Sequence, residues 1–269
     1  MKKGKGASQT RDTKQEKDLI DMKKDLINKG KEAVKALEAK QSKVSGSSAS
    51  ITVCKDLKHL NLTVPSLCTF YASSGSGKTY YLKELLFHAM VRKDFKKIYI
   101  ISPTAALPTS GWSEIADPPF LMEEVCMEKI EKLILLNKAI TEKGIHHPIL
   151  IILDDILGSI QDFNNNIFTS IATRLRHYNV SIWITSQYFF KLPCVLRSNA
   201  HMSFIFRQTS DKNFKGIYDE ILCSHFNTQR ECKKFIMDNT KEYGVICVDN
   251  NSNNIQVSKA RNKPYKYRV

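Results

Sequence analysis

The chain has 269 residues, enough for one sizeable α/β core but too few for two full enzymatic domains. Its 41 lysines and arginines exceed its 27 aspartates and glutamates, and the net charge of +14 favours a polyanionic partner such as nucleic acid. The alternative is an ordinary enzyme whose surplus positive charge lies in its terminal segments. The seven cysteines are scattered and include no Cys-x-x-Cys pair, which argues against a disulfide framework or a zinc ribbon.

The first 50 residues differ from the rest because lysine recurs, aromatic residues are absent, and the segment closes in the Ser/Gly run 45–50, which is typical of a linker. Apolar residues at helical spacing predict a charged amphipathic helix over about 13–40, although Gly30 weakens it. A solvated, partly ordered extension is the alternative. The segment has no apolar stretch of the kind that secretory signals contain, so we expect an unsecreted protein.

From residue 51 onward, short β-branched or apolar runs alternate with longer helical patterns, which predicts a parallel sheet built from βαβ units. The expected strands are 67–72, 97–102, 148–153, 180–186 and 202–207. The expected helices are 78–92, 123–142, 164–178, 211–221 and 227–239, followed by a hairpin near 243–258. We therefore expect an α/β domain over 51–258. The basic, tyrosine-containing tail 259–269 suits either contact with a phosphate backbone or no fixed structure.

The first expected strand and helix flank a small-residue loop, Ala72-Ser73-Ser74-Gly75-Ser76-Gly77-Lys78-Thr79, which has the context that a Walker A motif requires. Such a loop turns successive backbone N–H groups toward a polyphosphate, and the helix that follows directs its positive end at the same place. Lys78 should reach the β and γ phosphates of ATP, and the Thr79 hydroxyl should ligate Mg²⁺. Ala72 replaces the consensus glycine, but it is the smallest substitute. The expected nucleotide-binding residues are Ser73, Ser74, Gly75, Ser76, Gly77, Lys78, Thr79 and Tyr80.

Two adjacent carboxylates, Asp154 and Asp155, end the apolar run 148–153, as in a Walker B element. Asp154 would hold Mg²⁺, and Asp155 would act as the general base on the attacking water. Glutamate is the commoner residue at the second position, so the assignment of the base stays open. The apolar run is far shorter than the roughly 20 residues that span a bilayer, so we expect no membrane partner.

The expected strand 180–186 is followed by Gln187, which would lie beside the γ phosphate if this strand runs between the Walker A and Walker B strands, as in RecA-like proteins. The alternative is that Thr185 and Gln187 only cap a strand. Arginines often neutralise charge on the transferred phosphoryl group from a neighbouring subunit. Arg174, Arg176 and Arg197 are the candidates, with surface ion pairing or DNA contact as their alternatives.

These motifs together resemble the poxvirus-type genome-packaging ATPases of large DNA viruses and virophages, a branch of the FtsK/HerA superfamily. The resemblance covers roughly residues 60–210 and includes the 72–82 loop, the 152–155 acids, the 176–187 segment and the Leu-Arg-Ser-Asn-Ala run 196–200. It implies a RecA-like (ASCE) fold and an ATP-fuelled homo-oligomeric ring of five or six subunits that threads double-stranded DNA into a preformed capsid. It further implies capsid or portal-vertex partners, a location in viral factories of the host cytoplasm or with the virion, Gln187 as sensor, and Arg176 or Arg197 as the arginine acting in trans.

Two other functions remain open on the sequence. One keeps the same chemistry with another cargo, as in translocases for conjugation, export or chromosome segregation. The other is a basic DNA-binding structural protein whose nucleotide pocket is regulatory or inert, which Ala72 and the aspartate at position 155 favour slightly.

Overall fold

The computed structural model describes residues 51–53, 60, 62, 64–91, 93–113, 115–116, 120–124, 126–156 and 166–259. The predicted extension over 1–50 lies outside these residues, and so does the predicted tail beyond Lys259. Within the described ranges, no helix combines the length and the apolar character that crossing a membrane requires.

The described part of the chain contains a sheet of nine strands in the order β1-β9-β8-β7-β2-β6-β5-β3-β4. Only β8 is antiparallel to its neighbours in this part of the chain, since all the other pairings are parallel. The predicted α/β class with a mainly parallel sheet is therefore confirmed. The strands are β1 (Ile51–Val53), β2 (Leu67–Tyr71), β3 (Lys97–Ile101), β4 (Leu121–Met122), β5 (Ile149–Leu153), β6 (Val180–Ser186), β7 (Met202–Ile205), β8 (Gly244–Asp249) and β9 (Asn254–Lys259).

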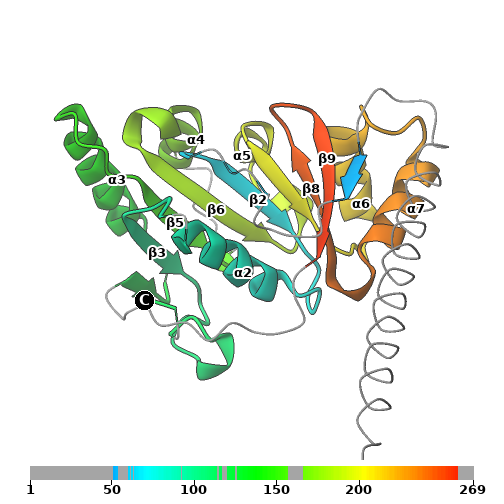
Figure 1. The fold of residues 1–269 in the computed structure, drawn as a ribbon, viewed down its shortest axis with the longest axis horizontal. Coiled ribbons are helices and arrows are strands. Elements are labelled where there is room, and N and C mark those ends of the chain that lie inside the picture. The colour runs from blue at the N-terminus through cyan, green and yellow to red at the C-terminus, as the bar shows by residue number, and fades with distance from the viewer. Residues whose placement is uncertain are drawn as a thin grey trace, which may run out of the picture. The chain divides into compact units, whose positions relative to one another are not determined.

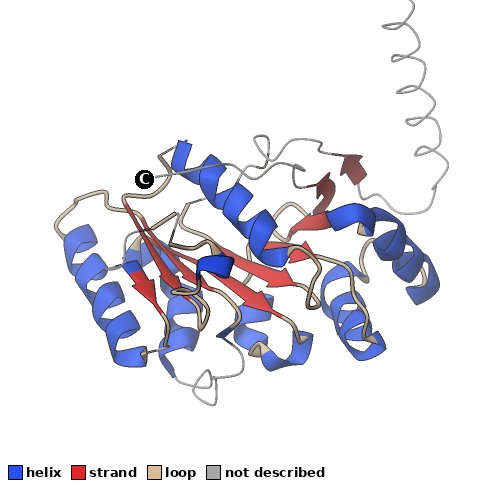
Figure 2. Cartoon of the chain, turned by 90° about the horizontal axis from the view of Figure 1, so that it is seen from below, coloured by secondary structure: helices blue, strands red, loops and turns tan. Residues whose placement is uncertain are grey.

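Helices cover both faces of the sheet (Figures 1 and 2). One face packs against α2 (Lys78–Val91), which follows β2 directly. The other packs against α3 (Met127–Glu142), α4 (Asn166–Tyr178), α5 (Cys194–Ser198), α6 (Asp211–Ile217) and α7 (Gln229–Asn239). This two-sided cover explains why the central strands read as unbroken apolar runs instead of alternating ones.

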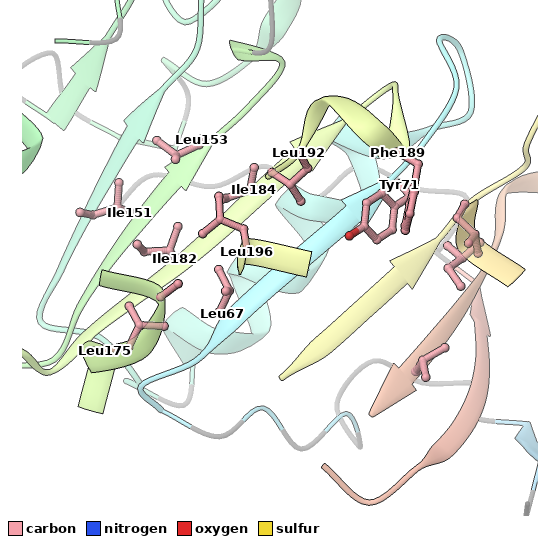
Figure 3. Close-up of a cluster of buried hydrophobic side chains, with 14 of the residues drawn as sticks. Leu67, Tyr71, Ile151, Leu153, Leu175, Ile182, Ile184, Phe189, Leu192 and Leu196 are labelled. Atoms are coloured by element: carbon pink, nitrogen blue, oxygen red, sulfur yellow. The ribbon is translucent and has the colours of Figure 1, made fainter. Parts of the chain in front are cut away.

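Each central strand sends alternate side chains into two separate cores. From β2, Leu67 and Tyr71 enter the core under α4 and α5, whereas Cys68 and Phe70 enter the core under α2. Figure 3 shows the first core, where Leu67 and Tyr71 lie beside Leu192 and Leu196. A fully buried large apolar side chain stabilises the fold by about 1.5–3 kcal/mol relative to exposure. Packing on both faces therefore holds β2, β5 and β6 side by side, with their carboxyl ends at one edge of the sheet.

The expected strands are all present with boundaries within a few residues, but several other elements differ from the prediction. The helix expected from 123 begins at Met127, and Leu121–Met122 before it form β4, a strand that the sequence did not predict and that pairs with β3. The helix expected over 211–221 is α-helical only to Ile217 and continues as a π-helical turn, η7 (Tyr218–Leu222). The sequence patterns also gave no sign of β1 or α5.

Candidate nucleotide-binding site

The loop between β2 and α2 has the geometry of a phosphate-binding turn. Gly75 and Gly77 adopt φ values of 72° and 83°, the left-handed region that favours glycine. The Ser76 backbone N–H and hydroxyl both donate to the Ser73 carbonyl, at 3.2 and 2.7 Å. Ala72 is buried, and its N–H donates to the Ser186 carbonyl at 3.0 Å. The methyl group in place of the consensus glycine is therefore accommodated in the core under α2.

The segment that follows β7 contacts this loop from the side opposite to β6. The Ser73 hydroxyl lies 3.2 Å from the Thr209 hydroxyl and accepts the Thr209 backbone N–H at 3.3 Å. The Gln208 amide donates to the Tyr71 carbonyl at 2.9 Å. The loop is therefore held by β6 on one side and by the segment after β7 on the other. The Tyr80 side chain, at the start of α2, is partly buried against the core under that helix.

Asp154 lies at the end of β5, directly across from the loop, and only 2% of its surface is exposed. The Thr79 hydroxyl donates to its Oδ2 at 3.4 Å, and the Lys78 ammonium lies 3.8 Å from its Oδ1. The two motifs predicted to hold one ligand therefore converge in space. Their oxygen donors are of the kind that Mg²⁺ prefers, so the residues fit this cation.

Two residues that the sequence did not assign to the site hold the Asp154 carboxylate. The Thr185 hydroxyl donates to Oδ1 at 2.9 Å, and the Trp112 indole N–H donates to Oδ2 at 3.2 Å. The Thr185 hydroxyl also accepts the Asp155 backbone N–H at 2.8 Å. Thr185 therefore does more than cap a strand, since one hydroxyl positions both acids. Trp112 is fully buried in a segment without helical or strand periodicity, and no sequence pattern links it to Asp154.

Asp155 is turned toward solvent and carries two partners. Its backbone φ is 56°, a conformation that aspartate tolerates better than most residues. The Gln187 amide donates to both carboxylate oxygens at 2.8 and 2.9 Å, and the Lys78 ammonium lies 3.4 Å from Oδ1. β6 lies between β2 and β5, as in the RecA-like arrangement on which the prediction for Gln187 depends, and Gln187 follows β6 at the sheet edge where it contacts Asp155.

Gln187 is also tied to α6 through a buried asparagine. The Asn213 amide donates to the Gln187 carbonyl at 2.9 Å, and its Oδ1 accepts the Phe189 N–H at 3.2 Å. These bonds join the backbone around Gln187 to α6, and the role of Gln187 as a sensor stays a prediction.

The candidate arginines lie in different surroundings. Arg174 and Arg176 are exposed near the end of α4, which leads into the start of β6, at the sheet edge opposite to the phosphate loop. The Arg197 guanidinium is largely covered, pairs with the Glu220 carboxylate at 2.8 Å and stacks over the Phe189 ring at 4.9 Å. These contacts tie α5 to η7 within one chain, and action on a neighbouring subunit stays a prediction for each arginine.

Three comparisons with known proteins bear on this site. The family described as "Poxvirus A32 protein" matches residues 60–252. Uncharacterized protein 075L of Invertebrate iridescent virus 6 is 26% identical over 146 residues, which is 54% of this chain and 55% of that protein. The chain therefore matches only about half the length of this curated relative.

Solved structures share the fold at low sequence identity. The genome packaging NTPase B204 from Sulfolobus turreted icosahedral virus 2, in complex with AMP, superposes with a TM-score of 0.57 at 15% identity, covering 74% of this chain and all of B204. The DNA-packaging ATPase B204 from Sulfolobus turreted icosahedral virus gives a TM-score of 0.55 at 18% identity, with the same coverage. The pCW3 conjugation coupling protein TcpA gives 0.50 at 13% identity, covering 73% of this chain and 60% of TcpA.

Proposed function

This chain belongs to the Poxvirus A32 protein family, and we propose that it is an ATPase that drives the packaging of viral double-stranded DNA into a preformed capsid. The observation that carries the proposal is the convergence of Lys78, Thr79, Asp154 and Asp155 at one edge of a parallel sheet. Ligands of open α/β sheets bind at this carboxyl edge, and a lysine with paired acids is the set of groups that phosphoryl transfer uses.

Each residue has a defined task in this proposal. The loop amides around Gly75 to Thr79 bind the phosphates, and Lys78 neutralises their charge. Thr79 and Asp154 hold Mg²⁺, which when bound neutralises charge on the transferred phosphoryl group. Asp155 accepts a proton from the attacking water after it parts from Gln187 and Lys78, and Gln187 reports the change to Asn213 and α6.

The cargo and the assembly are further parts of the proposal. The net charge of +14 supports a long polyanion as the partner, and the two B204 structures that share the fold come from proteins described as packaging enzymes. The motor works as a homo-oligomeric ring of five or six subunits in viral factories of the host cytoplasm and engages capsid or portal-vertex proteins. Arg176 or Arg197 acts on the nucleotide of a neighbouring subunit within this ring.

Phosphate release by the purified full-length protein, with and without double-stranded DNA, tests the proposal. We expect hydrolysis that DNA stimulates and that Lys78→Ala and Asp155→Asn abolish. Lys138→Ala is the matched control, because this lysine lies on α3 and pairs at the surface with Glu142 at 3.5 Å. Undiminished turnover in both site variants would show that the residue assignment is wrong.

Two outcomes would redirect the assignment of function. Binding of DNA that is independent of ATP, together with no phosphate release, would identify a structural protein with an inert pocket. Co-purification with a membrane channel instead of capsid components would identify a translocase with another cargo, a possibility that the shared fold of TcpA keeps in view.

A further inference from the structure

A tyrosine from the far end of the chain lies on the phosphate loop. Tyr243 lies between α7 and β8, and its ring atom Cδ1 is 2.8 Å from the position that a Cβ on Gly77 would occupy. The absence of a side chain at Gly77 is thus what allows the ring to approach. The residue nevertheless stays 61% exposed, so the ring contacts the loop and still leaves much of its surface open to a ligand.

The turn that carries this ring is built in an uncommon way. Glu242 and Tyr243 are consecutive non-glycine residues with φ values of 50° and 63°, and such conformations cost about 1–2 kcal/mol for each residue. Gly244 follows, where an added Cβ would lie 2.1 Å from the Asn239 carbonyl oxygen. The Glu242 carboxylate pairs with Lys259 on β9 at 2.6 Å. Unfavourable backbone that its surroundings maintain often marks a ligand contact.

The same hairpin is joined to the helix that follows the phosphate loop. The Tyr81 hydroxyl of α2 lies 2.5 Å from the Ser258 hydroxyl of β9 and 3.3 Å from the Cys247 sulfur of β8. All three residues are buried. The hairpin that follows the Tyr243 turn therefore contacts α2 through buried polar groups, and in Figure 1 the turn before β8 lies beside the β2–α2 loop.

The strand order indicates on which side of β2 each end of a bound nucleotide lies. Asp154, Asp155 and Gln187 follow β5 and β6, on one side of β2, and mark where the terminal phosphate and the metal belong. β7 and β8 lie on the other side of β2, and Tyr243 immediately precedes β8. A nucleotide whose terminal phosphate faces the acids extends its nucleoside toward the side where this ring lies.

We propose that the Tyr243 ring forms the nucleobase subsite and stacks on the base of the bound nucleotide. This inference rests on the nucleotide site of the proposed function and adds its base-binding part. Stacking uses the π face that every base has and reads no hydrogen-bonding edge. The ring therefore contributes affinity for ATP and GTP alike, and discrimination between them does not come from this residue.

Equilibrium binding to the full-length protein, measured by calorimetry in the presence of Mg²⁺, tests the subsite without depending on turnover. Two ligands are compared, ATPγS and inorganic tripolyphosphate, which lacks the base. We expect Tyr243→Ala to weaken ATPγS binding at least about fivefold, the lower limit for loss of one aromatic–base stack, and to leave tripolyphosphate binding unchanged. Tyr243→Phe keeps the ring and should bind ATPγS like the wild type. Met237→Ala, which truncates an exposed side chain on the neighbouring α7, is the matched control.

The outcomes separate this inference from the proposed function. Equal weakening of both ligands by Tyr243→Ala would show that the ring supports the loop and not the base, and unchanged ATPγS binding would remove the subsite; both results overturn the inference and leave the nucleotide site intact. Failure of the wild-type protein to bind either ligand would instead overturn the nucleotide site itself.

Discussion

Replacing Thr185 with valine removes the hydroxyl that positions both acids while keeping the branched shape of the side chain. The lost bond to the Asp154 carboxylate is 2.9 Å long and buried, and a hydrogen bond to a charged group contributes about 1.5–3 kcal/mol. The Asp155 N–H loses its acceptor as well, but Asp155 is exposed, so water replaces much of that bond. We therefore expect the free energy of unfolding to fall by about 2 kcal/mol.

The same substitution should also weaken the proposed Mg²⁺ site. Loss of an outer partner of a metal-binding carboxylate typically costs 10–100-fold in metal affinity or activity, so the Mg²⁺ concentration that gives half-maximal ATP hydrolysis should rise by about that factor. Thr185→Ser is the control, because it keeps the hydroxyl and loses only a buried methyl group, at about 1 kcal/mol of stability. Urea unfolding and a magnesium titration measure the two effects. Valine and serine variants with the same magnesium requirement would refute this account of the Asp154 carboxylate.

Three further substitutions test other contacts. Trp112→Phe removes the indole N–H that Asp154 accepts and should lower the free energy of unfolding by about 2 kcal/mol in a urea titration followed by circular dichroism. Gly244→Ala places a methyl group against a backbone carbonyl before β8, so we expect a loss of about 1–3 kcal/mol in the same titration, and a stable variant would show that the turn can yield. Burial lowers the pKa of His201 below its ordinary 6.5, so the unfolded state binds the proton first and the free energy of unfolding falls as pH drops from 7 toward 5. His201→Gln should make that fall shallower without abolishing it, because the pKa of His225 is also lowered by burial, and an unchanged slope would count against the role of His201.

The central part of the site could be predicted because local pattern and topology agree there. Apolar runs end in the Walker A loop, in Asp154–Asp155 and in Gln187, and the carboxyl ends of adjacent parallel strands necessarily meet at one sheet edge. Periodicity gave the strands, and the strand order β2–β6–β5 then brought the polar residues together. The sequence therefore predicted the site residues that directly follow strands with a clear apolar pattern.

The contacts that depend on the path of irregular segments could not be found in this way. Trp112 reaches Asp154 from a segment that has neither helical nor strand periodicity, and Tyr243 reaches Gly77 through two left-handed residues that have no sequence signature. The pairing of Arg197 with Glu220 likewise depends on where a π-helical turn places the glutamate. In each case the long-range packing, and not the local preference of the residue, decides the contact.

The two partners of Asp155 have a consequence for the resting protein. The Gln187 amide donates to both of its carboxylate oxygens and the Lys78 ammonium lies 3.4 Å from one of them, so an attacking water must compete with these groups for the carboxylate. We expect an isolated subunit to hydrolyse bound ATP slowly. We expect faster hydrolysis when contact with another molecule moves Gln187 away from Asp155.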